Sequence, residues 1–460
     1  MTAIETSPSL DALRGRLAGS VVGPGDADWG VARQAWNLCA DQHPAAVVVP
    51  ASADDVVAAV EIARAHGLRV APQGTGHAAT ALGDLGDTIL LKTTQLTGVE
   101  IDVEARRARV GAGTVWKELT APASEHGLAP LAGSSPNVGI VGYALGGGVS
   151  WLGRKHGLCA DAVTAVELVT ADGRLVRADA ETEPDLFWAV RGGGGSFGVV
   201  TAIELELFDV GPEVFAGAMM FPAARAQEVM QAWRAWTTTA PDEVTTSFRI
   251  LYVPDDPSIP EPMRGGAFAV IDGAFLGDEA QADELFAPLR AMEPIMDGWA
   301  MVPPAALSYV HMDPEDPMPG LSDSSMLTAL PAQAVDRVIE LAGVGSGTPL
   351  MMIEVRHLGG ALSRARAGQG ARGAFDGDYA TFFGGAPMGP GTAEGILDAA
   401  RELVEALEPW QAPSSYLNFV EREADPAGFF RPEAYARLRA IKAAVDPADV
   451  IRSNHPIPPA

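Results

Sequence analysis

Short apolar runs alternate with helical patterns in the first half of the chain. The run AAVVVP (residues 45–50) predicts a strand that ends at Pro50, and residues 52–67 predict a helix that ends at Gly67. Ser52 and Asp55 have the spacing of a capping box at the start of this helix. Further strands are predicted at residues 68–74, 88–93, 98–102 and 107–113, a helix at 114–127, and a hairpin at 165–178. This order predicts an α+β fold rather than a doubly wound sheet.

The pattern changes at about residue 214, where longer strand candidates alternate with amphipathic helices. Strands are predicted at residues 214–221, 244–253, 265–277, 350–360 and 379–385, and helices at 223–240, 278–292, 331–343 and 391–408. This pattern predicts a second domain, in which helices cover a sheet. Residues 303–323 are rich in Pro, Met and Asp and predict a long loop, of the kind that often forms a lid. In the last segment, SYLNF (415–419) predicts a strand and residues 432–445 predict a helix.

The charge of the chain narrows the classes of partner. It carries 59 acidic and 32 basic side chains in 460 residues, a formal charge of −27. Binding to phosphate backbones or anionic lipid needs clustered basic residues, so we expect neither nucleic-acid nor membrane partners. Only Cys39 and Cys159 are present, too few for a disulfide framework. The first 19 residues lack an apolar signal-peptide core, so we expect a cytoplasmic protein.

Three glycine-rich segments lie within the first 200 residues, at 72–80, 134–148 and 191–200. The last contains the spacing GxGxxG at Gly193, Gly195 and Gly198, but a helix is predicted before it and a strand after it. That is the reverse of the order in a dinucleotide-binding loop. Together the segments indicate an extended ligand that passes between backbone segments, with ordinary tight turns as the alternative for each one. His77 has no second ligand at metal-binding spacing, so no metal site is expected.

Four segments in this order resemble the berberine bridge enzyme-like FAD-linked oxidases of the vanillyl-alcohol oxidase superfamily. They are residues 45–80, 133–173, 185–201, and YLNF (416–419) with residues 437–457. The resemblance covers about residues 33–457. It implies a PCMH-type FAD-binding domain of two α+β subdomains in residues 1–210, with its core at about 40–210. It also implies a substrate domain with an antiparallel sheet covered by helices in residues 211–410, and a C-terminal segment, 411–460, that returns to the FAD domain.

The resemblance also implies where FAD binds. His77 occupies the usual attachment point of the flavin 8α-methyl group, and an alkylated imidazole draws electrons from the flavin and favours hydride acceptance. Ser135 stands where many relatives carry a cysteine for a second link, so a single covalent bond is expected. Tyr143 replaces the histidine of the common GHxxGGG pattern, which leaves the ribityl contact at that point open. The implied cofactor-binding residues are Gln73, Gly74, Thr75, Gly76, His77, Ala78, Ser135, Gly139, Gly142, Tyr143, Gly146, Gly198, Val200 and Asn454.

Two strand candidates supply the catalytic residues. Alternation in MMIEVRHLGG puts Glu354 and Arg356 on one face, and the resemblance places Glu354 at a position that often holds an active-site polar residue. Tyr416 and Asn418 resemble the YxN pair of the family, and Tyr416 is the general base if a nearby cation acidifies its phenol. The alternatives are an exposed cross-strand ion pair for Glu354 and Arg356, and a buried packing residue for Tyr416.

The predicted function is that of an FAD-dependent oxidase. A base removes a proton from a small organic substrate, hydride passes to covalently bound FAD, and dioxygen reoxidises the flavin to give hydrogen peroxide. The alternatives are a dehydrogenase with another electron acceptor and a flavin-binding protein without turnover. The segment YVHMDPEDPMPG favours a medium-sized, partly apolar substrate. We also expect a role in secondary metabolism. A monomer or a homodimer is expected.

Overall fold

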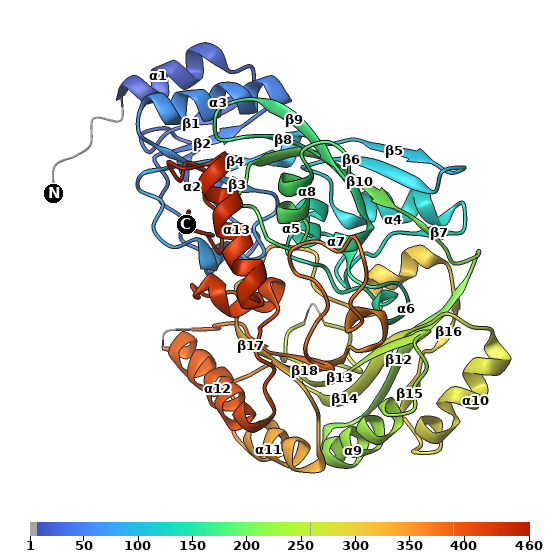
Figure 1. Cartoon of the computed structure of the whole chain (residues 1–460). Helices are drawn as coiled ribbons and strands as arrows, with labels where there is room; N and C mark the ends of the chain where they lie inside the picture. The colour runs from blue at the N-terminus through green and yellow to red at the C-terminus, as the bar shows by residue number, and fades with distance from the viewer. Residues whose placement is uncertain (1–6, 258, 390) are drawn as a thin grey trace.

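The computed structural model of the chain describes residues 7–257, 259–389 and 391–460. It confirms the predicted α+β class, because three large sheets are combined with helices that pack against them (Figure 1). The helices of the first half are α1 (Ser7–Arg16), α2 (Trp29–Ala32), α3 (Ala53–Ala65), α4 (Trp116–Ser124), α5 (Ile140–Leu145), α6 (Gly153–His156), α7 (Cys159–Ala162) and α8 (Pro184–Val190). Those of the second half are α9 (Ala226–Thr237), α10 (Glu279–Arg290), α11 (Ala332–Ala342), α12 (Thr392–Ala406) and α13 (Pro432–Val445).

The first sheet has the order β1-β2-β4-β3. Its strands are β1 (Ser20–Val22), β2 (Ala46–Val49), β3 (Arg69–Gln73) and β4 (Thr88–Lys92), and β2, β3 and β4 run parallel. The crossover from β2 to β3 contains α3, whose first turn Ser52 caps by accepting the Asp55 N–H at 3.3 Å. The predicted capping box is only half formed, since the Asp55 carboxylate accepts the N–H groups of Ala18, Gly19 and Ala51 instead.

The second sheet is antiparallel and has the order β5-β6-β10-β8-β9. Its strands are β5 (Val99–Asp102), β6 (Arg107–Gly111), β8 (Val163–Val169), β9 (Leu175–Asp179) and β10 (Val199–Glu206). The predicted hairpin is confirmed as β8 and β9, with Gly173 at a φ of +87° in the turn, where a side chain would be strained. A short ribbon pairs β7 (Leu128–Ala129) with β11 (Phe208–Asp209). The run of glycines at 192–195 lies between α8 and β10, so it does not begin a helix as a dinucleotide-binding loop would.

The third sheet is antiparallel and belongs to the second half of the chain. Its order is β15-β12-β14-β13-β18-β19-β17, with β16 also paired to β12. The strands are β12 (Val214–Pro222), β13 (Val244–Tyr252), β14 (Ala267–Phe275), β15 (Met296–Asp297), β16 (Ala300–Val302), β17 (Leu321–Leu327), β18 (Met352–His357) and β19 (Tyr379–Gly385). Helices α9 to α12 cover its outer face, where Trp233, Phe286 and Phe383 form part of an apolar core (Figure 1). The other face is turned toward the first two sheets (Figure 1).

Two sequence-based predictions of local structure are wrong. Residues 303–323 are not a continuous loop, because residues 304–309 form a 3₁₀ helix and β17 begins at Leu321. The polar sequence of β17 hid the strand, although Ser325 is buried and bonds to Thr381 of β19 at 2.9 Å. The predicted strand in SYLNF is a 3₁₀ helix at residues 417–419, closed by a bond of 3.0 Å from the Phe419 N–H to the Tyr416 carbonyl.

The C-terminal segment leaves the third sheet and returns to the first two. Helix α13 packs against α8 in the upper half of the molecule (Figure 1). The buried Lys442 ammonium donates to the carbonyls of Ser196 and Ile451, both at 2.9 Å, and pairs with Asp446 at 2.6 Å. Lys442 therefore links the C-terminal segment to Ser196, which directly follows the glycine run at 192–195. The division of the chain into domains at about residues 210 and 410 stays a prediction.

Within the part of the chain that the structure describes, no helix combines the length and the apolar character needed to cross a bilayer.

Candidate active site

A cavity of about 560 Å³ lies between the third sheet and the first two. This volume is typical of sites that enclose a cofactor or a drug-sized molecule. The three glycine-rich segments, separated in sequence, meet in its wall. Every residue predicted to contact the cofactor lines it: Gln73, Gly74, Thr75, Gly76, His77, Ala78, Ser135, Gly139, Gly142, Tyr143, Gly146, Gly198, Val200 and Asn454. Sequence-based reasoning and the fold thus agree on one location.

The wall of this cavity has the shape and the polar groups that a flavin nucleotide needs. A Cβ atom at Gly142 would meet nothing within 4 Å, so the missing side chain leaves room for a ligand. Backbone N–H groups exposed by such glycines bind phosphate oxygens. Two buried polar atoms, His77 Nε2 and the Tyr143 hydroxyl, have no hydrogen-bond partner among the described residues. A bound ligand would supply these partners, so the residues present fit FAD.

His77 is held as a neutral imidazole. Its ring stacks on Trp36 with a centroid distance of 3.9 Å. Burial lowers the pKa of His77 to about 4, although the nearby Asn137 acts in the opposite direction. The Ser135 hydroxyl donates to Asn137 Oδ1 at 2.9 Å in the same part of the wall. Among the described residues that line the cavity, none is a cysteine.

Tyr416 presents its phenol oxygen to two N–H donors. The Val149 backbone N–H donates to it at 3.0 Å and the Asn418 carboxamide at 3.1 Å. The Asn418 carboxamide also donates to the Tyr143 carbonyl at 2.9 Å, which fixes its position. Burial raises the pKa of Tyr416 to about 12, although the two donors and the Arg356 guanidinium favour the phenolate. The sequence made Tyr416 the base only if a nearby cation acidifies its phenol, and here burial outweighs the effect of Arg356.

Five charged side chains form a buried network on the inner face of the third sheet. Arg249 of β13 pairs with Asp272 of β14, and His311 Nδ1 lies 3.0 Å from the same carboxylate. His311 Nε2 lies 3.4 Å from Glu354 Oε2, and Arg356 Nε donates to Glu354 Oε1 at 2.7 Å. The alternative of an exposed cross-strand ion pair for Glu354 and Arg356 is wrong, because both side chains are only 3–4% exposed.

The network holds its members in their charged forms. Burial opposes ionisation of Glu354, but Arg356 and His311 outweigh it and hold the pKa of Glu354 below its ordinary value. Burial and Arg249 oppose protonation of His311, but Asp272 and Glu354 outweigh them and raise its pKa. With His311 protonated, three cations face two anions, so the network carries a net positive charge. Glu354 is consequently a poor proton acceptor.

Arg356 carries this positive charge to the cavity. Its guanidinium lines the cavity and lies over the Trp151 ring, with 4.8 Å between the guanidinium carbon and the ring centroid. The carboxylate of Glu354 lies behind it and is not part of the lining. Of the four predicted catalytic residues, Arg356, Tyr416 and Asn418 thus face the cavity and Glu354 supports Arg356.

Sequence-based reasoning missed Arg249, Asp272 and His311. A signal was present, since Arg249 and Asp272 interrupt the apolar runs that form β13 and β14. A charge inside a buried strand needs a partner. Which partner it finds depends on strand order, and β13 lies between β14 and β18. His311, in a segment predicted as a loop, carried no comparable signal.

The segment that contains His311 also closes part of the cavity. The Trp36 indole donates to the Glu315 carbonyl at 3.2 Å, and Lys117 pairs with the Glu315 carboxylate at 2.9 Å. The Asn37 carboxamide donates to the Gly320 carbonyl at 3.0 Å. These contacts hold residues 313–320 against the first half of the chain at the edge of the cavity.

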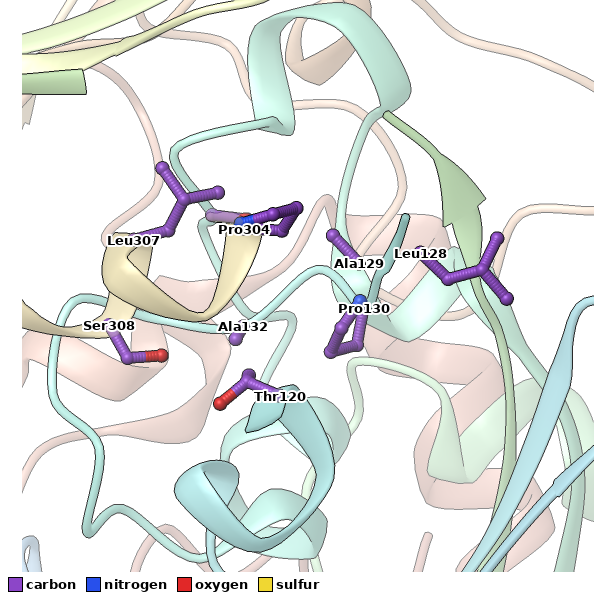
Figure 2. A pocket seen from close by; sticks show the side chains of 9 residues that line it. Thr120, Leu128, Ala129, Pro130, Ala132, Pro304, Leu307 and Ser308 are labelled. Carbon is purple, nitrogen blue, oxygen red and sulfur yellow. The ribbon is translucent and has the colours of Figure 1, made fainter. Parts of the chain in front are cut away.

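A second hollow, of about 10 Å³, lies between α4 and residues 304–308 (Figure 2). Its labelled side chains are apolar apart from Thr120 and Ser308. It has room for about one water molecule and contains no titratable group, so it offers no site for chemistry.

Comparison with known proteins agrees with this site. A family model described as FAD binding domain matches residues 44–179, and one described as Berberine and berberine like matches residues 415–458. The chain is 28% identical over 459 residues to (R)-6-hydroxynicotine oxidase from Paenarthrobacter nicotinovorans, covering 96% of this chain and 97% of the relative. Its fold is similar to that of BBE-like 1 from Physcomitrella patens, with a TM-score of 0.85 and 22% identity over 98% of this chain and 99% of the other. It is also similar to 6-hydroxy-D-nicotine oxidase from Arthrobacter nicotinovorans, with a TM-score of 0.80 and 24% identity over 98% of both chains.

The fold, the cavity and these matches define an FAD-linked oxidoreductase. The matches to both ends of the chain confirm the resemblance to the berberine bridge enzyme-like FAD-linked oxidases.

Proposed function

We propose that this protein is an oxidase that removes two electrons from a small organic molecule and passes them to dioxygen. The observation that supports this most directly is the meeting of Tyr416, Asn418 and Arg356 with the glycine-rich segments in one cavity. The names of the relatives, which include nicotine and oligosaccharide oxidases, point in the same direction.

The residues of the chain divide the chemistry between them. When bound, FAD supplies a hydride acceptor that can later be reoxidised. Oxidation of a C–H bond next to an O–H or N–H group forms a C=O or C=N bond, releasing one hydride and one proton. Tyr416 is the proposed acceptor of that proton, held by the Val149 N–H and by Asn418. Dioxygen then takes up two electrons and two protons and becomes hydrogen peroxide.

Arg356 has a complementary part in the proposal. Its positive charge, sustained by Glu354 at 2.7 Å, favours electron-rich atoms of the substrate and the phenolate form of Tyr416. Glu354 is then a positioning residue rather than the base, since its own pKa is lowered by Arg356 and His311. The alternative assignment of the base to Glu354 is less favourable for that reason.

The covalent link to FAD is also a proposal. His77 is neutral, because burial lowers its pKa to about 4, and its Nε2 has no partner. A neutral imidazole with a free lone pair is the form that could bond to the flavin 8α carbon. A C–H bond of the methyl group would break, its proton would be released, and its two electrons would pass to the flavin and then to dioxygen. Ser135 has no thiol to offer, so one bond through His77 is expected.

Three further expectations stay predictions. They are dioxygen as the acceptor, a monomeric or homodimeric state, and a cytoplasmic location. Anaerobic reduction of the flavin by a substrate, followed by admission of air, tests the first of them. Rapid reoxidation with one peroxide formed per flavin supports an oxidase. Flavin that is reduced but stays reduced in air indicates a dehydrogenase, and flavin that no candidate substrate reduces contradicts the proposal.

A further inference from the structure

A second ionisable group faces the cavity at a distance from Arg356. Glu421 lines it just after the 3₁₀ helix at 417–419, and its Oε2 accepts a hydrogen bond from the Ser322 hydroxyl at 2.7 Å. Its carbonyl is bonded to the Thr80 hydroxyl, which fixes the backbone. The Oε1 atom makes no hydrogen bond with any described residue.

Among the residues that the structure describes, no cation pairs with the Glu421 carboxyl. The neighbouring Arg422 is 55% exposed and pairs instead with Asp323 at 3.3 Å, and no described Lys, Arg or His lies within ion-pairing distance of Glu421. Burial raises the pKa of Glu421 to about 7, against the Ser322 hydrogen bond, as expected for a carboxyl without a cationic partner.

The register of the third sheet gives the separation of the two charged ends. Ser322, Gly384 and Met352 form one cross-strand row, and Arg356 lies four residues further along β18 on the same face. Four residues of an antiparallel strand span about 13 Å. Phe382 lies in the row between them and faces the cavity, so the floor from one end to the other is apolar.

The cavity therefore has a cation beside Tyr416, an apolar floor, and an unpaired carboxyl at the far end. We infer that the substrate is an elongated molecule with a protonated amine remote from the carbon that is oxidised, and that Glu421 binds this ammonium group. The inference rests on the proposed function, because it takes Tyr416 to mark the reacting end. It adds a chemical class of substrate and names the residue that selects it.

Binding to the holoenzyme tests this inference without any need for turnover. The probes are two aryl alcohols of equal length, 4-(3-aminopropoxy)benzyl alcohol and 4-butoxybenzyl alcohol, and perturbation of the flavin absorption spectrum gives their dissociation constants. The wild type should bind the amine about 10- to 100-fold more tightly than the neutral probe, as expected for a hydrogen bond between charged groups.

The variant Glu421→Gln keeps the shape of the side chain and removes its charge, so it should reduce this preference to less than about threefold while the neutral probe binds as before. Glu423→Gln, which removes an exposed carboxylate two residues away, is the matched control and should keep the wild-type preference. Flavin content and unfolding temperature show that each variant is folded.

Several results would overturn the inference. They are equal affinities of the wild type for the two probes, no binding of either, or a preference that persists in Glu421→Gln. A different result would contradict the proposed function. If the holoenzyme prefers the amine but no substrate reduces its flavin, the Glu421 site is supported and the oxidase activity is not.

Discussion

Replacing His77 with alanine tests the covalent link most directly. With a pKa of about 4, three units below neutrality, the imidazole is protonated in about one molecule in a thousand at pH 7, so its nucleophilic form is nearly always present. Its Nε2 has no partner in the protein. In the wild type, flavin should therefore stay on the polypeptide after acid denaturation, giving a yellow precipitate and a peptide with residue 77 that carries the mass of one FAD.

His77→Ala should still bind FAD, because the remaining wall of the cavity is unchanged, but acid should release all of its flavin into the supernatant. Ser135→Ala alters the same wall without touching the imidazole and is the matched control, so its precipitate should stay yellow. The measurements are absorption of pellet and supernatant, and mass spectrometry of the peptides. A colourless wild-type pellet, or a yellow pellet from His77→Ala, would refute the reasoning.

Four further predictions concern chemistry, stability and partners. Tyr416→Phe should slow flavin reduction in anaerobic stopped-flow by about 100-fold or more with unchanged flavin content, since general-base catalysis contributes roughly 10²- to 10⁴-fold, and an unaltered rate would remove the phenol from the mechanism. Because the phenolate is the reactive form and the pKa of Tyr416 is raised to about 12, kcat/KM should still rise with pH between 7 and 10, and a plateau there would contradict the assignment. Asp272→Asn should cost about 3 to 5 kcal/mol in the free energy of unfolding, measured with denaturant, because it leaves the buried Arg249 and His311 short of a counter-charge, and a loss below about 1 kcal/mol would argue against the network. With a formal charge of −27, the protein should pass through a heparin column at physiological salt, and retention would show that the charge argument was misapplied.

The sequence was sufficient for the features that depend on local pattern. Most of the predicted helices and strands are present, because apolar periodicity and glycine punctuation are local signals, whereas the polar strand β17 and the 3₁₀ helix at 417–419 were not predicted. The glycine-rich segments around His77, Tyr143 and Gly198 could be assigned to one ligand, and they do line one cavity.

Features that depend on strand order could not be predicted in the same way. The partners of Arg249 and Glu354 are set by the neighbours of β13 and β18, which periodicity does not reveal. Burial of Tyr416, which raises its pKa, results from the packing of three parts of the chain. The place of Glu421 in the cavity wall could not be predicted, because a carboxylate in a short C-terminal segment is ordinarily exposed. Its hydrogen bond with Ser322 of β17 depends on the fold.

The return of the C-terminal segment has a consequence for the biosynthesis of the enzyme. Tyr416, Asn418, Glu421 and Asn454 all lie in the wall of the cavity, and Lys442 fastens this segment to the glycine run before β10. While the ribosome still holds these residues, the cavity lacks one wall, even though His77 and the three glycine-rich segments have already been synthesised. We therefore expect stable binding of FAD only after residues 416–454 have left the ribosome.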